Sequence, residues 1–155
     1  MPNSLPYLFP DRVILHLASS RKVDAIRELA SLFQDSDSVT NFRMFLSALL
    51  RKEQRFGSAV EHGVALPHYR DDSIVDPIVS VGVAPDGIDW ENGGRVHILV
   101  LVGWPNKHQG AYLRTVAEVA SAFRLQTVRS AVLKSKSSED VIRTMREAIS
   151  SGATS

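Results

Sequence analysis

The sequence contains no cysteine, which excludes a disulfide framework and any chemistry that uses a thiol. It also has no excess of either charge. It has 18 Lys and Arg residues and 17 Asp and Glu residues, so its net charge gives no indication of binding to nucleic acid. The longest apolar run, near residue 100, is too short to span a bilayer, and the first residues lack the pattern of a signal peptide. We therefore expect a cytoplasmic protein that does not insert into a membrane.

Apolar residues are plentiful enough for one sizeable core, because 44% of the 155 residues are hydrophobic. Some segments repeat apolar residues at helical spacing, and others are short apolar runs typical of strands. Helices interspersed with strands indicate a layered α/β domain. We expect one domain over residues 1–155, with a core at about 13–149, an irregular N-terminus and a small polar tail.

The pattern predicts the boundaries of most elements. Strands are expected at 13–17, 64–66, 78–84 and 96–102, with a turn at 85–87. Helices are expected after a serine cap at Ser19 or Ser20, after Thr40, over a stripe from Leu113 to Phe123, near 128–132 and from Ser138. The second of these helices is expected to end near Arg51 and Lys52. Its dipole would favour positive charge there.

The most informative stretch runs from Gly57 to Arg70 and contains two histidines, a hydroxyl, a carboxylate and an arginine. Val64 to Leu66 is typical of a buried strand, and we expect Pro67 to end it. His68 then follows the strand, held by a residue of fixed φ. In most proteins a lone histidine at such a place is only a polar surface residue, so the surrounding residues decide its interpretation.

Gly63-Val64-Ala65-Leu66-Pro67-His68 resembles the signature of the fructose/mannitol-type enzyme IIA domains of the bacterial phosphotransferase system, a family with nitrogen-regulatory members. The resemblance implies a single α/β domain with a mixed β-sheet flanked by helices. It also implies that His68 is the phosphorylated histidine. The family's later basic residue falls on Arg70, its Arg-Glu pair on Lys52 and Glu53, and its Thr or Ser on Ser58.

The chemistry implied by the resemblance is phosphoryl relay. His68 would accept phosphate from the phosphocarrier protein HPr and pass it to an enzyme IIB, with no metal or organic cofactor. Phosphoryl transfer depends on positioning and charge stabilisation, so Arg51, Lys52 and Arg70 are candidate counter-charges and Ser58 a candidate hydrogen-bond donor. His62 takes the place of a frequent Asn in the motif, so we include it among the residues expected to stabilise the phosphoryl group or to neighbour His68.

Family members often carry a second active-site histidine at the start of the helix that follows a Pro-containing loop. Matching the apolar stripe places this position on Tyr112, and His108 lies four residues earlier. If the helix already includes His108, the two side chains share one face, and either could approach His68. We expect His108→Ala to lower the transfer rate and Tyr112→Phe to lower it less. His108 as an ordinary loop residue is the alternative.

Three further interpretations stay open at this point. His62 and His68 could share one face of an extended segment, but no third ligand with metal spacing accompanies them. The chain could instead be a regulator that signals its phosphorylation state by binding a target protein, or a degenerate domain that no longer carries phosphate. The chain does not specify a sugar, because in the family the membrane component selects it.

Overall fold

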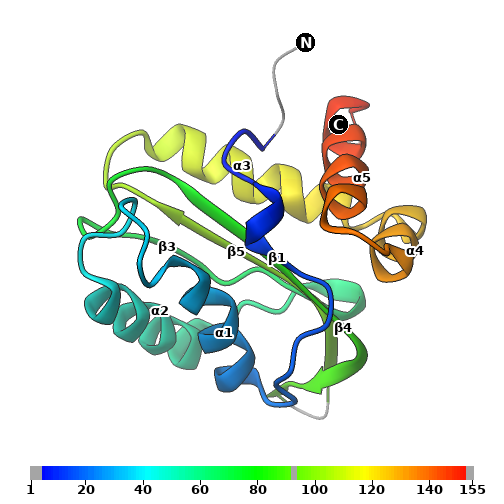
Figure 1. Cartoon of the computed structure of the whole chain (residues 1–155), viewed down its shortest axis with the longest axis horizontal. Coiled ribbons are helices and arrows are strands. Elements are labelled where there is room, and N and C mark those ends of the chain that lie inside the picture. The colour runs from blue at the N-terminus through cyan, green and yellow to red at the C-terminus, as the bar shows by residue number, and fades with distance from the viewer. Residues whose placement is uncertain (1–4, 92–93, 153–155) are drawn as a thin grey trace.

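A computed structural model of the chain describes residues 5–91 and 94–152, so part of the expected irregular N-terminus (1–4) and of the polar tail (153–155) lies outside the described residues. Within the described part, a five-stranded sheet lies between two layers of helices (Figure 1). β4 and β5 pair antiparallel and the other pairs are parallel. The predicted α/β class, a mixed sheet flanked by helices, is confirmed.

The strand order is β1-β4-β5-β2, and β3 also pairs with β5. The strands are β1 (Val13–Ile14), β2 (Val64–Ala65), β3 (His68–Arg70), β4 (Ile78–Asp89) and β5 (Arg95–Trp104). The helices are α1 (Lys22–Ala30), α2 (Phe42–Phe56), α3 (Gln109–Ala122), α4 (Gln126–Lys134) and α5 (Ser138–Ser150), with 3-10 turns at Pro10–Arg12, Ser31–Phe33 and Glu61–Gly63. None of the described helices combines the length and apolar character that crossing a membrane requires.

The two faces of the sheet pack against different helices, and β5 shows this directly. Its Leu99 and Leu101 belong to the core formed with α1 and α2. Its Val100 and Val102 belong to the core formed with α3, α4 and α5. A strand covered on both faces needs apolar residues at successive positions, which explains the nearly continuous apolar run. This arrangement makes β5 the rigid strand against which the candidate site is built.

Helix α2 differs from the expectation at both ends. Its N-cap is Asn41, whose side chain accepts a hydrogen bond of 3.1 Å from a backbone N–H of the first turn, rather than Thr40. The helix continues for one turn beyond Arg51 and Lys52 and ends at Gly57, whose φ of 69° lies in the region that favours glycine. The basic pair therefore lies inside the helix, and its predicted place at the C-terminus is wrong.

Two other helices also correct the expectation. Neither expected serine caps α1, because Arg21 occupies the N-cap position and the hydroxyl of Ser19 donates to Glu28 instead. On α3, Leu113 is 53% exposed, whereas Tyr112 is buried. The buried face of α3 is thus rotated relative to the predicted stripe, since tertiary packing selects the face. This rotation brings Tyr112 towards the sheet.

Two boundaries are displaced by a few residues. The turn expected at 85–87 is an irregularity inside the long strand β4, where the pairing register with β5 shifts between Val83 and Ile88. Such a shift bends a strand without ending it. The last helix is capped by Ser137, whose side chain accepts from a backbone N–H at 3.1 Å, one residue before the expected Ser138.

Candidate functional site

The candidate site is built on an edge strand that is interrupted at Leu66 and Pro67. β2 and β3 both pair with β5, so His68 lies opposite Val102 in the same sheet. We expected Pro67 to end the strand and leave His68 in a loop, but β3 resumes at His68. The Pro67 carbonyl accepts a hydrogen bond of 3.0 Å from the Val102 N–H. At a sheet edge the missing proline N–H costs nothing, so pairing continues through it.

The imidazole of His68 is half-buried and held in one orientation. Its Nδ1 lies 2.5 Å from the carbonyl oxygen of Leu66. A carbonyl can only accept, so Nδ1 carries the hydrogen and Nε2 keeps its lone pair. Burial lowers the pKa of His68 from its ordinary 6.5, and the charge of Lys52 acts in the same direction. The ring is therefore neutral at neutral pH, and its Nε2 lone pair can act as a nucleophile.

Helix α3 places Tyr112 beside this imidazole. The ring centroids of His68 and Tyr112 are 6.0 Å apart, at an interplanar angle of 49°. Burial raises the pKa of Tyr112 to about 12, against a smaller opposing effect of Arg70. The phenol therefore stays protonated and can donate a hydrogen bond at neutral pH. Arg70 follows His68 by two residues on β3, so both side chains leave the same face of the strand. The structure thus brings His68, Arg70 and Tyr112 together.

Lys52 reaches the site from α2 and contacts the backbone. Its ammonium donates a hydrogen bond of 2.6 Å to the carbonyl of His68. Burial lowers the pKa of Lys52, against the opposing charge of Glu53. Arg51 is exposed and donates to Ser47 at 2.8 Å, one turn back along the helix. Of the predicted basic pair, only Lys52 is thus placed at the site.

Ser58 lies beside the strand that carries His68. Its carbonyl accepts a hydrogen bond of 2.9 Å from the N–H of Leu66, whose own carbonyl holds the imidazole. Its hydroxyl oxygen is buried, and within residues 5–91 and 94–152 it has no hydrogen-bond partner. A buried hydroxyl without a partner can still donate a hydrogen bond to an incoming group.

Glu53 matches the Glu of the family's Arg-Glu pair, but sequence reasoning assigned it no role at the site. The residue is 4% exposed, and its carboxylate accepts a hydrogen bond of 2.8 Å from the N–H of Ser58. The ammonium of Lys22 lies 3.1 Å from the same oxygen and also contacts Glu91. Glu53 therefore ties the Ser58 segment to α2 and α1. The signal was present, since Glu53 follows Leu49 by four residues and so continues the apolar stripe.

His62 is not brought to His68. Its backbone is left-handed, with φ of 67°, and its side chain is exposed, with Nε2 3.5 Å from Glu61. It borders a pocket with Ala120 of α3, eight residues after Tyr112. At the helical rise this is a distance of about 12 Å along the helix. No group of three or more metal-ligating side chains occurs in the described part of the chain.

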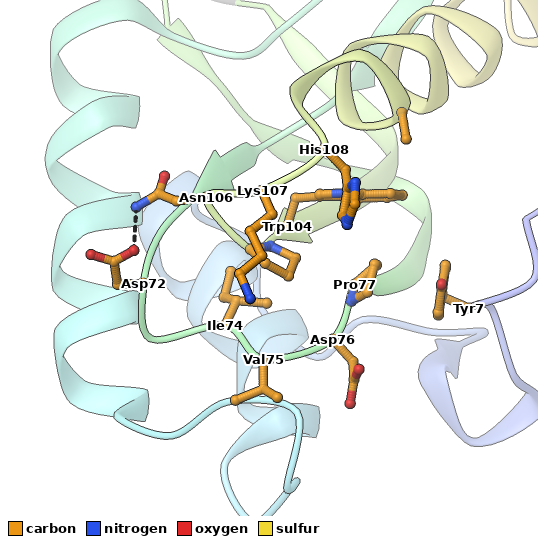
Figure 2. A pocket seen from close by; sticks show the side chains of 12 residues that line it. Tyr7, Asp72, Ile74, Val75, Asp76, Pro77, Trp104, Asn106, Lys107 and His108 are labelled. Atoms are coloured by element: carbon orange, nitrogen blue, oxygen red, sulfur yellow. Dashed lines mark hydrogen bonds between the residues drawn. The ribbon is translucent and has the colours of Figure 1, made fainter.

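His108 does not share a helical face with Tyr112, because α3 begins only at Gln109. The backbone of His108 is left-handed, with φ of 58°, and occupies the N-cap position without a side-chain cap. Its exposed side chain lies near Trp104, at the rim of a neighbouring pocket (Figure 2). Of the two candidates for the second position, only Tyr112 lies against the His68 ring.

The family model that describes the EIIA 2 component of the phosphoenolpyruvate-dependent sugar phosphotransferase system matches residues 6–148. The chain is 26% identical over 141 residues to a mannitol-specific phosphotransferase enzyme IIA component of Staphylococcus aureus, covering 89% of this chain and 94% of that protein. It is 20% identical over 130 residues to a fructose-specific EIIABC component of Bacillus subtilis, covering 83% of this chain but only 20% of that longer protein.

Solved structures show the same fold at lower identity. The nitrogen regulatory protein IIA-Ntr of Neisseria meningitidis superposes with a TM-score of 0.82 at 18% identity, covering 90% of this chain and 96% of that one. The mannitol enzyme IIA of Escherichia coli, solved in complex with phosphorylated mannitol enzyme IIB, gives a TM-score of 0.77 at 15% identity. It covers 89% of this chain and 96% of that one.

Proposed function

The chain belongs to the EIIA 2 family of the phosphoenolpyruvate-dependent sugar phosphotransferase system, and on that premise we propose that it carries a phosphoryl group on His68. One observation carries the proposal. The Leu66 carbonyl fixes the hydrogen of the His68 ring on Nδ1, so Nε2 is a positioned, neutral nucleophile. The donor is phospho-HPr and the acceptor is an enzyme IIB.

In the transfer step the Nε2 lone pair forms a bond to phosphorus while the bond between phosphorus and the donor breaks. The imidazole becomes cationic, and its Nδ1–H then donates more strongly to the Leu66 carbonyl. The phosphoryl oxygens gain charge stabilisation from Arg70 and hydrogen bonds from the Tyr112 and Ser58 hydroxyls. Lys52 adds a positive field from behind the strand. Passing the group to enzyme IIB reverses these changes.

The direction of the relay rests on the relatives. The mannitol enzyme IIA of Escherichia coli was solved with a phosphorylated enzyme IIB, which supports an enzyme IIB as the partner of this chain. Transfer to a sugar would then follow in a downstream component. A regulatory role, in which the phosphorylation state is reported to a target protein, stays a prediction, because the likeness to the nitrogen regulatory protein is a likeness of fold.

Intact-mass measurement tests the proposal. The protein is incubated with phosphoenolpyruvate, enzyme I and HPr, and one acid-labile phosphoryl group is expected. Peptide mapping should place it on His68. The His68→Ala variant should fold like the parent and stay unlabelled, whereas His62→Ala should be labelled like the parent, because His62 lies outside the site. Full labelling of His68→Ala would overturn the assignment.

A further inference from the structure

A pocket of about 690 Å³ lies between the C-terminal part of α2 and strand β3, and we call it the α2 pocket. Its volume is within the range of small-molecule sites, about 300–1,000 Å³. Most of the side chains that line it are cationic or aromatic: Ala48, Arg51, Lys52, Gln54, Arg55, Phe56 and Tyr69. Among the residues that the structure describes, no Asp or Glu belongs to this lining. The pocket therefore combines positive charge with aromatic surface.

The α2 pocket lies on the side of β3 opposite to the His68 imidazole. Successive residues of a strand point to opposite faces, so the side chains of His68 and Tyr69 separate. Tyr69 packs against the core formed with α1 and α2, whereas Tyr112, which contacts the His68 ring, belongs to the other core. Lys52 touches both places, because it lines the pocket and donates to the His68 carbonyl. A ligand in the pocket would thus meet Lys52 without occupying the space beside the imidazole.

The charges of the α2 pocket favour an anion. Arg51 and Arg55 are exposed and lie one turn apart on the same face of the helix. Arg51 donates to Ser47, but within residues 5–91 and 94–152 neither arginine forms an ion pair. The nearby carboxylate of Glu53 is buried and paired with Lys22. The end of a helix adds only about half a negative charge, which does not offset three cations.

The aromatic side chains indicate which anion fits. Phe56 is 72% exposed, and the guanidinium of Arg55 lies 5.4 Å from the centre of its ring. Guanidinium groups bind phosphate through paired hydrogen bonds, and aromatic faces and guanidinium planes stack on nucleobases. A molecule with phosphates and a flat ring uses both features. A glutamate-rich protein segment would pair with the cations but leave the ring of Phe56 uncovered.

We propose that the α2 pocket binds a nucleotide, with its phosphates on the three cations and its base against Phe56 and Tyr69. A bound phosphate competes with the His68 carbonyl for the ammonium of Lys52. Occupancy of the pocket therefore slows phosphorylation of His68, an effect that rests on the proposed function. The nucleotide acts as a regulator, because it lies on the other side of β3 from the Nε2 atom that accepts the phosphoryl group.

Calorimetric titration with ATP, GTP, inorganic triphosphate and adenosine at constant ionic strength tests the site. ATP or GTP should bind more tightly than either fragment. Arg55→Gln and Phe56→Ala should each raise the Kd of that nucleotide at least about fivefold. Arg43→Gln and Phe9→Ala are the matched controls and should leave it unchanged, since both residues are exposed and lie outside the pocket.

Three results would overturn the nucleotide site. They are no binding of ATP or GTP at millimolar concentration, binding of inorganic triphosphate as tight as that of the nucleotides, and binding of polyglutamate tighter than that of the nucleotides. The second would show a general anion site, and the third would show a surface for an acidic protein segment.

The effect on His68 is measured with phosphoramidate, a small phosphoryl donor that needs no docking surface. The nucleotide that binds should slow labelling of the parent protein and of Arg43→Gln, and at the same concentration slow Arg55→Gln less. An unchanged labelling rate in the saturated parent would overturn the link between the pocket and His68. Failure of phosphoramidate to label His68 without nucleotide would overturn the proposed function, while the titration still decides the nucleotide site.

Discussion

The ammonium of Lys52 contacts the backbone of His68, through a hydrogen bond of 2.6 Å to its carbonyl oxygen. The imidazole of the same residue lies against the ring of Tyr112. Lys52 of α2 and Tyr112 of α3 therefore approach β3 from two different helices. Arg51, the neighbour of Lys52 in sequence, donates to Ser47 and is exposed. Lys52 therefore lies at the candidate site and Arg51 on the exposed surface of α2, although the two were predicted to act as a pair.

Lys52→Ala should slow phosphoryl transfer far more than Arg51→Ala. The substitution removes a hydrogen bond from a charged donor, which is worth about 1.5–3 kcal/mol, and with it a positive charge near the phosphoryl dianion. The transfer rate should fall by about 10- to 150-fold if that energy is realised in the transition state. Rapid-quench measurement of the rate from phospho-HPr checks this. Equal rates in the two variants would mean that Lys52 only supports the strand.

Tyr112→Phe should lower the transfer rate, and His108→Ala should not. The phenylalanine keeps the packing of the buried ring but removes its hydroxyl, for an expected loss of about 0.5–1.5 kcal/mol, or roughly two- to tenfold in rate. Sequence reasoning led us to expect the larger effect from His108→Ala. The order is reversed here because His108 is exposed and precedes α3. A larger effect of His108→Ala than of Tyr112→Phe would restore the original order.

The protonation midpoint of His68 should lie below 6.5, because burial opposes the charged ring. Labelling by phosphoramidate should therefore keep its neutral-pH rate down to that value and decline only below it. NMR titration of the His68 ring protons gives the midpoint independently. A midpoint at or above 6.5, or a rate already falling at pH 7, would contradict the prediction.

The same shift has a consequence for stability. Below pH 6.5 the unfolded chain binds a proton at His68 that the folded chain resists, so the contribution of His68 to the free energy of unfolding falls as the pH falls through this window. This contribution to the free energy of unfolding is fully present above pH 6.5. The difference in unfolding free energy between the parent and His68→Gln, measured at several pH values, should show this dependence.

Glu53→Gln should lower the free energy of unfolding by about 1.5–3 kcal/mol, the usual value of hydrogen bonds to a charged group. The neutral side chain no longer offsets the charge of Lys22 and accepts less strongly from Ser58. Urea unfolding measures the change. Glu147→Gln on the exposed face of α5 is the control and should shift the free energy by no more than about 0.5 kcal/mol. Equal stability of both variants would show that Lys22 needs only Glu91.

The sequence was sufficient to predict β5 and the buried strand that precedes His68. Residues 96–102 are almost all apolar, as expected of a strand covered on both faces. It did not predict β3, because His68, Tyr69 and Arg70 carry no alternation of apolar and polar residues. Their pairing comes from Val102 to Trp104, far along the chain. Long-range pairing overrides local propensity in sheets.

Other site details depended on backbone conformations that composition does not reveal. A left-handed His108 ends the preceding loop and keeps its side chain out of α3. A non-glycine residue rarely adopts this conformation, so nothing in the sequence indicated it at His108. We had therefore considered a helix that already includes His108. The buried place of Glu53 was not predicted, because the helix was expected to end near Arg51 and Lys52. One further turn places this carboxylate in the interior, where it needs the partners that the structure provides.

The interrupted edge strand has a further consequence for how copies of the protein behave at high concentration. An open strand edge offers unpaired N–H and C=O groups, which is a template for aggregation with other chains. Here Pro67 has no N–H to offer, and the ammonium of Lys52 already occupies the His68 carbonyl. Ser58 covers the edge at Leu66. The strand that carries His68 is thereby protected against strand-to-strand association.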